Sequence, residues 1–102
     1  MITINDLNHV WEYLYYNRCK EDAIRLCIEA EQYFKGNDLR LQYDTDPETG
    51  DPYLCLMVCF AKVAKQTYKE EVARFKDLEA RVDKFRCDSD LPNLPIQVMV
   101  GY

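Results

Sequence analysis

The sequence predicts a single α+β domain over residues 1–102, in which a small, mainly antiparallel, three-stranded sheet packs on helices. Apolar residues recur every three or four positions before Gly36 and again after Thr67, which is typical of helices that bury one face. Between these stretches the spacing changes to two, and a turn rich in proline and glycine divides the segment into two strands. The predicted order is a helical hairpin, a β-hairpin, a third helix and a C-terminal strand.

The composition is that of a folded globular chain, with 48% hydrophobic and 13% aromatic residues. A formal net charge of −5 opposes the phosphate attraction on which nucleic-acid binding depends, so we expect no nucleic-acid partner. The sequence shows no secretion signal and no apolar run of the roughly eighteen residues that span a bilayer. Five cysteines cannot all pair within one chain. We therefore expect a cytoplasmic protein with reduced thiols and no membrane partner.

The first predicted helix begins near Thr3. Thr3 and Asp6 have the spacing of a capping box, in which each side chain satisfies a backbone N–H of the first turn. Ile2 and Leu7 occupy the flanking positions of a hydrophobic staple. The apolar stripe that this helix would pack against the core consists of Leu7, Val10, Trp11, Leu14 and Tyr15.

A second helix follows after a break between Asn17 and Lys20, because the next positions on the first stripe would be charged. Its stripe consists of Ala23, Cys27, Ala30 and Phe34, widened by Ile24, Leu26 and Tyr33. The helix ends at Gly36-Asn37, where glycine permits a left-handed C-cap. The two helices should therefore form a hairpin with a short connection.

The β-hairpin begins with a strand over 38–45, whose apolar face carries Leu39, Leu41 and Tyr43. A turn over 46–52 supplies Pro47 and Gly50 where a turn needs a fixed φ and a positive φ. The return strand, from Tyr53 to about Lys62, is apolar on both faces. One face carries Leu54, Leu56, Val58 and Phe60, and the other carries Tyr53, Cys55, Met57, Cys59 and Ala61. We expect this strand in the middle of the sheet, because both of its faces need cover.

Thr67 and Glu70 form a second capping box, which begins a third helix that ends near Cys87. Its apolar positions lie close to a heptad seam and are Tyr68, Val72, Phe75, Leu78, Val82 and Phe85. A final strand over 96–100 alternates apolar residues with Gln97 and Met99. We expect it beside the return strand, reached by a right-handed crossover through the third helix. The alternatives are a place beside 38–45 or across a dimer boundary.

The middle of the chain carries a recognisable motif. A helix ends in Tyr-Phe-Lys-Gly at 33–36, a strand follows, and the hairpin reads Asp-Pro-Glu-Thr-Gly-Asp-Pro-Tyr-Leu-Cys-Leu over 46–56 before a charged helix. With this motif, over about residues 20–86, the chain resembles uncharacterised small prokaryotic α-β-β-α proteins. The resemblance implies no settled activity, and some of those proteins are encoded beside toxin or nucleotidyltransferase genes. The tail over 87–102 departs from their pattern.

The acidic turn is the strongest metal candidate in the sequence and contains Asp44, Asp46, Glu48 and Asp51. Counted from Asp44, a calcium loop would need Gly at Thr49 and Glu at Cys55, so the pattern fails. Cys55 and Cys59 would have Cα atoms about 13 Å apart on an extended strand, too far to share one zinc ion. The three isolated glycines form no phosphate-binding loop. We expect no metal site and no cofactor.

Catalysis has few candidates. His9 is the single histidine, and only Cys19 or an acidic neighbour could act with it. His9 borders the first apolar stripe, which favours a surface histidine over a catalytic one. We therefore assign no catalytic residue and expect a non-enzymatic protein. A small ligand-binding enzyme with a pocket between sheet and helices is the alternative.

A protein partner is the function class that remains. Helices on one face of a three-stranded sheet would leave the apolar side chains of the return strand uncovered on the other face, which a monomer rarely tolerates. The chain also contains eight tyrosines, a residue suited to protein contacts. The candidate partner surface comprises Tyr53, Cys55, Met57, Cys59, Tyr13 and Tyr16.

Three kinds of cover for that surface are open: the chain's own helices, a second copy, or a different protein. The expected function is a small intracellular interaction module that works as a homodimer or within a heteromeric complex. The net charge of −5 also suits an acidic inhibitor or an antitoxin-like protein that neutralises a basic partner.

Overall fold

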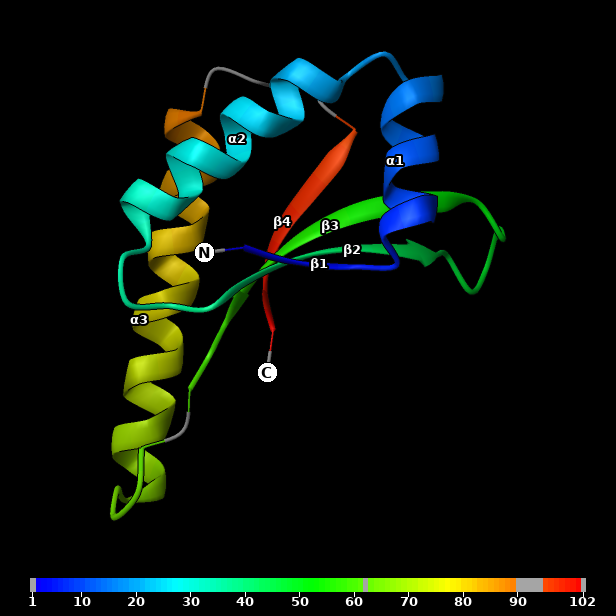
Figure 1. Ribbon diagram of the computed structural model, residues 1–102. Helices are drawn as coiled ribbons and strands as arrows, with labels where there is room; N and C mark the ends of the chain where they lie inside the picture. Colours follow the sequence, from blue (N-terminus) through cyan, green and yellow to red (C-terminus); the bar gives the residue numbers. More distant parts are fainter. Residues whose placement is uncertain (1, 62, 90–94, 102) are drawn as a thin grey trace.

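The computed structural model describes residues 2–61, 63–89 and 95–101, and it has the α+β composition that the sequence predicts (Figure 1). The elements, in chain order, are β1 (Ile2–Asn5), α1 (Leu7–Tyr16), α2 (Lys20–Tyr33), β2 (Leu39–Thr45), β3 (Pro52–Cys59), α3 (Tyr68–Asp88) and β4 (Ile96–Gly101). The predicted end of the return strand at Lys62 lies outside the described residues.

The sheet differs from the prediction. Within the described residues it has four strands in the order β1-β2-β3-β4, and two of their three pairings, β1 with β2 and β3 with β4, are parallel. The prediction of a mainly antiparallel, three-stranded sheet is therefore wrong. Both parallel pairs are joined through helices, which is the connection that parallel strands require. The predicted places of β2 and β4 on either side of β3 are confirmed.

The prediction of the sheet first fails at the N-terminal end of the described chain. Thr3 belongs to β1, and Asp6, with a φ of 56°, precedes α1 without a capping hydrogen bond from its side chain, so the predicted capping box is wrong. Ile2 and Ile4 alternate with polar residues and pair with Leu39 and Leu41 of β2. This strand has only four residues, which is too short for its period to be distinguished from a helix start.

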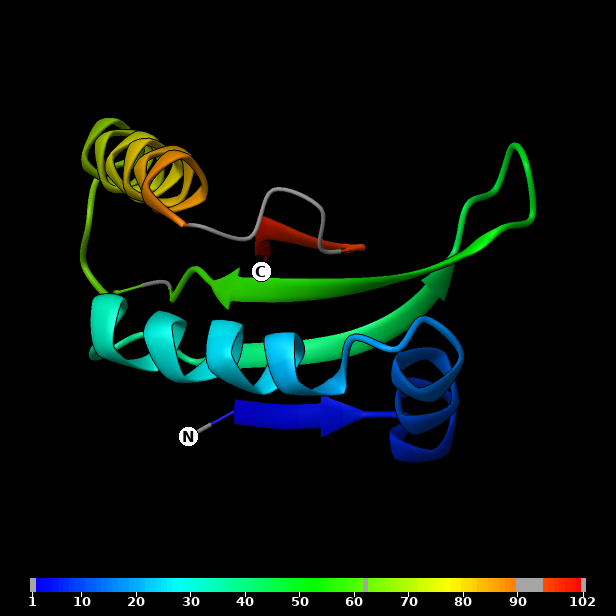
Figure 2. The same ribbon diagram turned by 90° about the horizontal axis from the view of Figure 1, so that it is seen from above.

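The first helical stripe is also only partly buried. Val10 and Leu14 are buried, whereas Leu7, Trp11 and Tyr15 are 55%, 49% and 78% exposed. Figure 2 shows the reason: α2 lies over the sheet, while α1 stands at the end of β1. A helix in that position covers the sheet with one narrow side only.

The capping box at the start of α3 is confirmed, because the Thr67 Oγ1 accepts a hydrogen bond from the Glu70 backbone N–H at 3.2 Å. The buried face of α3 carries Leu78, Val82 and Phe85. The N-terminal half of the helix extends past the sheet (Figure 1).

The core lies between the helices and one face of the sheet. On that face the strands contribute Leu39, Leu41, Leu54, Leu56, Val58, Ile96 and Val98. Phe34, the residue that follows α2, packs against Phe85 of α3 with ring centroids 5.3 Å apart. This contact joins the end of α2 to α3 within the core.

Candidate interaction surface

Four of the predicted partner residues lie on one face of β3. Tyr53, Cys55, Met57 and Cys59 alternate with the helix-facing residues of the same strand, so their side chains point to the opposite face of the sheet. Cys55 is buried at 1% exposure, and the other three are half-buried. Of the four side chains, Cys55 is thus closed to solvent, and the other three are partly accessible.

On that face the residues of β3 are flanked by residues of the two neighbouring strands. Cys55 lies between Gln42 of β2 and Gln97 of β4 in the sheet register, and Met57 lies between Arg40 and Met99. Burial raises the pKa of the Cys55 thiol to about 11, with a further contribution from the nearby Asp44 carboxylate. The Cys55 thiol is therefore a neutral, packed side chain.

Tyr13 and Tyr16 of α1 are separated from those four residues, because α1 packs on the helical side of the sheet. Tyr13 is half-buried, and its hydroxyl donates a hydrogen bond to the Pro95 carbonyl at 3.1 Å. Burial raises the pKa of the Tyr13 hydroxyl. Tyr16 is 79% exposed. The six predicted residues thus do not form one continuous surface.

The candidate catalytic pair is not assembled. The His9 Nδ1 donates a hydrogen bond to the Asp6 carboxylate at 2.7 Å, and the His9 ring stacks on Tyr43 with centroids 5.0 Å apart. The hydrogen bond to Asp6 raises the pKa of His9. Cys19 is buried in the core, and burial raises the pKa of its thiol, so it is the opposite of an activated nucleophile.

The acidic turn uses its carboxylates to hold the backbone. Asp46 Oδ1 accepts a hydrogen bond from the Glu48 N–H at 2.8 Å, and Asp44 Oδ1 accepts one from the Thr45 N–H at 2.9 Å. Within residues 2–61, 63–89 and 95–101, no three histidine, cysteine or acidic side chains are grouped closely enough to hold a metal ion.

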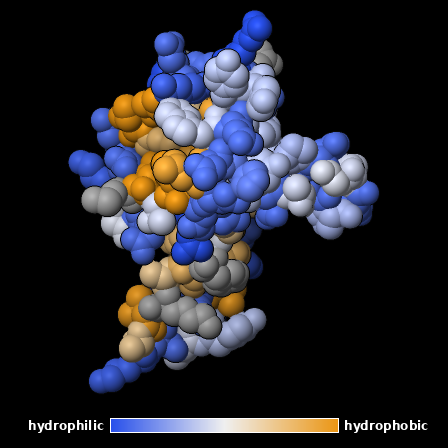
Figure 3. Space-filling model, turned by 45° about the vertical axis from the view of Figure 1, so that its right-hand side comes forward, coloured by the Kyte–Doolittle hydropathy of each residue, from blue (hydrophilic) through white to orange (hydrophobic). Residues whose placement is uncertain are grey.

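A group of exposed apolar side chains lies elsewhere, where β1, α1 and α2 meet. We call it the edge patch and define it as Ile4, Leu7, Trp11, Ile24 and Ile28. Each of these side chains is 44–55% exposed. Figure 3 shows orange, hydrophobic side chains gathered on this side of the molecule. The spacing of apolar residues predicted Leu7, Trp11 and Ile24 on helical stripes that face the core, and Ile4 and Ile28 were not among the predicted residues.

A groove of about 400 Å³ runs through the edge patch. Of the described residues that line it, Glu31 is the only charged one; the remainder are apolar or cysteine. The signal for this groove was present in α2: Ile24 and Ile28 are four residues apart and lie roughly 100–140° around the helix from Ala23, on a second apolar side.

The patch continues toward the junction of α1 and α2. A wider hollow of about 730 Å³ is lined there by Trp11, Tyr15 and Tyr16 together with Arg18 and Lys20. The Lys20 Nζ lies 4.6 Å from the centroid of the Trp11 ring, a cation–π contact. Aromatic and charged side chains thus form the rim of the apolar groove.

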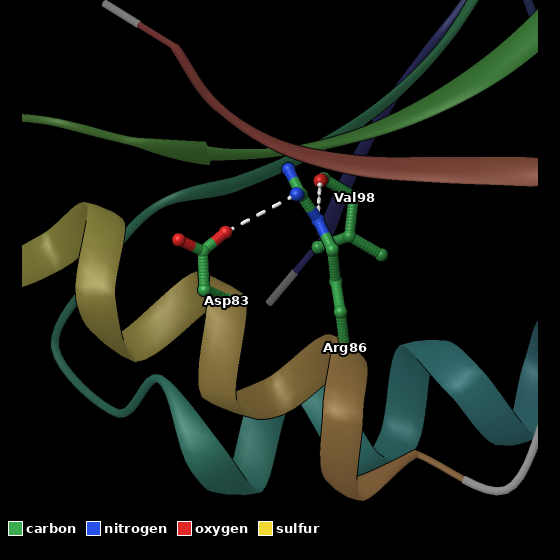
Figure 4. Close-up of polar contacts among 3 residues, drawn as sticks. All are labelled: Asp83, Arg86 and Val98. Carbon is green, nitrogen blue, oxygen red and sulfur yellow. Dashed lines mark hydrogen bonds and ion pairs between the residues drawn. The ribbon is translucent and has the colours of Figure 1, made fainter.

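The two outer edges of the sheet differ. At β4 the Arg86 Nε donates a hydrogen bond to the Val98 carbonyl, so a side chain of α3 occupies that edge (Figure 4). In the described part of the chain, no side chain makes a comparable hydrogen bond to β1. An edge strand left open in this way is a template for pairing with another chain.

Comparison with known protein families, with curated proteins and with solved structures finds no match to this chain. The resemblance to small prokaryotic α-β-β-α proteins therefore stays a prediction. In the described part of the chain, no helix is long and apolar enough to cross a membrane.

Proposed function

We propose that this chain is a non-enzymatic protein-interaction module, which works as a homodimer or as part of a heteromeric complex and binds through the edge patch. One observation carries the proposal: five large apolar side chains, each about half exposed, surround one groove beside an open strand edge. Apolar patches of this kind on soluble proteins are typical of interaction sites.

The residues that line the groove favour a binding site over a catalytic site. Among the described residues that line it, the titratable groups are the Glu31 carboxylate and the Cys27 thiol, and burial raises the pKa of that thiol to about 11, so it is not an activated nucleophile. His9 is held by Asp6 and Tyr43 instead of facing a nucleophile. An apolar groove with aromatic and charged residues at its rim has the anatomy of a protein interface.

Native mass spectrometry of the untagged protein, isolated from its own cells, tests the proposal. The wild-type chain should appear in an assembly of two or more chains. The variant Ile24→Asp/Ile28→Asp should appear mainly as a single chain, because two carboxylates would be desolvated in the interface. Tyr68→Asp is the matched control, since Tyr68 is 82% exposed at the far end of α3.

All three proteins should show the same far-UV circular dichroism, since the substituted side chains are exposed. A wild-type chain that is found only as a monomer would overturn the proposal. Assemblies that survive the double substitution would show that the edge patch is not the binding surface.

A further inference from the structure

Building on the proposed function, we infer that the occupant of the edge patch is a second copy of this chain, related by a two-fold axis beside β1. In this dimer the two β1 strands pair in antiparallel fashion and join the two sheets, and the two α2 helices face each other above the joined strands. The strand edge, the charges on α2 and the exposed apolar area each support this dimer.

The strand edge and the helix are compatible with one two-fold axis. β1 is the outermost strand, and Figure 2 shows α2 lying over the sheet close to it and running in the opposite direction. A two-fold axis perpendicular to the sheet, beside β1, makes both β1 and α2 antiparallel to their counterparts. The edge patch then meets its own copy, as an isologous interface requires.

The charges on α2 are complementary to themselves in this arrangement. Lys20 and Glu31 flank Ile24 and Ile28 on one side of the helix, within roughly 80° of arc at 100° per residue. When two such helices lie antiparallel, Ile24 is opposite Ile28 of the second copy, and Lys20 is opposite Glu31 of the second copy. Two ion pairs thus bracket the apolar contact, and a parallel arrangement would instead oppose like charges.

The exposed apolar area has the size that a dimer needs. With about 150–250 Å² for a fully exposed large side chain, the exposed fractions of the edge patch leave roughly 500 Å² of apolar surface on each copy. A stable interface buries about 800 Å² on each partner, of which roughly 56–65% is apolar. The edge patch therefore accounts for the apolar share of a standard interface.

Sedimentation velocity of the purified, reduced chain over a wide concentration range tests this dimer. The wild-type chain should change from monomer to dimer as the concentration rises. Lys20→Glu alone and Glu31→Lys alone should each raise the dissociation constant by about tenfold, because each creates two like-charge contacts in the dimer. The combination Lys20→Glu/Glu31→Lys should return it to within about threefold of the wild-type value.

As the matched control, the two charges of an ion pair on another side of α2 are exchanged. Arg25 and Glu29 form an exposed ion pair with a nitrogen–oxygen distance of 3.3 Å. The variant Arg25→Glu/Glu29→Arg retains the two charges and should dimerise as the wild-type chain does. Hydrogen exchange gives a second measure, since the β1 amides should exchange more slowly at dimer-forming concentrations.

A chain that sediments as a monomer at every concentration would overturn the second-copy inference. If native mass spectrometry then finds a different protein bound through the edge patch, the proposed function stands without self-association. A dimer that responds to neither single charge reversal would overturn the antiparallel arrangement of α2.

Discussion

The Arg86 Nε on α3 lies 2.6 Å from the carbonyl oxygen of Val98 on β4, the outermost strand beside β3 (Figure 4). The Arg86 Nη1 lies 3.2 Å from the Asp83 carboxylate, one turn earlier in the same helix. The guanidinium thus joins α3 to the β4 edge of the sheet. The planar guanidinium carries several N–H donors at fixed angles, so it can contact Val98 and Asp83 at the same time. A lysine ammonium does not have this donor geometry.

Replacing Arg86 should destabilise the fold through β4. We expect Arg86→Met to lower the free energy of unfolding by about 1–2 kcal/mol, because the hydrogen bond to Val98 is lost while the aliphatic packing is largely kept. Chemical denaturation measures the loss. Asp83→Asn is the control and should cost less than about 0.5 kcal/mol, because the Asp83 side chain is 71% exposed. Equal losses in the two variants would contradict a role for the contact with Val98.

The ion pair of Asp6 and His9 should make stability depend weakly on pH. The hydrogen bond to Asp6 raises the pKa of His9 above its ordinary value of 6.5, so the folded state binds the proton more tightly than the unfolded state. The stabilisation is fully present below pH 6.5 and is lost as the pH rises through the raised pKa.

Nuclear magnetic resonance titration of the His9 ring tests this expectation, with Asp6→Asn as the comparison. The variant should return the pKa of His9 toward 6.5 and remove the fall in unfolding free energy above that pH. Asparagine also tolerates the positive φ of residue 6, so the backbone should be retained. A wild-type pKa at or below 6.5 would contradict the effect of Asp6.

The cysteines should differ in their reactivity. Burial raises the pKa values of the Cys27 and Cys55 thiols to about 11, so at pH 8 only about one in a thousand is the reactive thiolate. Cys87 is exposed at the end of α3. Time-resolved alkylation with peptide mapping should therefore label Cys87 well before Cys27 and Cys55 in the native state, and at similar rates after denaturation. Early native labelling of Cys55 would show that its face of the sheet opens readily.

The parts of the fold that sequence could predict are those with strong local signals. The Thr67 capping box begins α3, Gly50 lies in the β2–β3 turn with a φ of 75°, and the two-faced β3 is central in the sheet. The segment Ile2–Asn5 could not be recognised as a strand from the sequence. Its pairing partner, β2, lies more than thirty residues away along the chain. Adding this parallel strand changed the sheet from mainly antiparallel to mixed.

Prediction of the edge patch would have required the same kind of non-local information. Three-residue and four-residue spacing placed Leu7 and Trp11 on an apolar stripe, but the stripe does not show how much of it a neighbouring element covers. α1 stands at the end of the sheet, so Trp11 faces the groove beside β1. Conversely, Cys55 is buried at 1% exposure between β2 and β4, and the alternation of residues along one strand does not reveal that burial.

The aromatic contact between Phe34, which follows α2, and Phe85 of α3 should hold the two helices together. Phe34 is 1% exposed and Phe85 is 5% exposed, with ring centroids 5.3 Å apart at an interplanar angle of 63°. The edge-to-face arrangement should contribute about 0.5–1.5 kcal/mol beyond the apolar area that it buries.

A double-mutant cycle isolates this contribution. Phe34→Leu and Phe85→Leu keep apolar side chains in the core, so each variant should fold at reduced stability. The double variant should lose about 0.5–1.5 kcal/mol less than the sum of the two single losses, because the ring contact can be lost only once. Strict additivity in chemical denaturation would mean that each ring is held by its own surroundings. The junction of the two helices would then depend on other contacts, such as the hydrogen bond from Arg81 to the Tyr33 carbonyl at 3.3 Å.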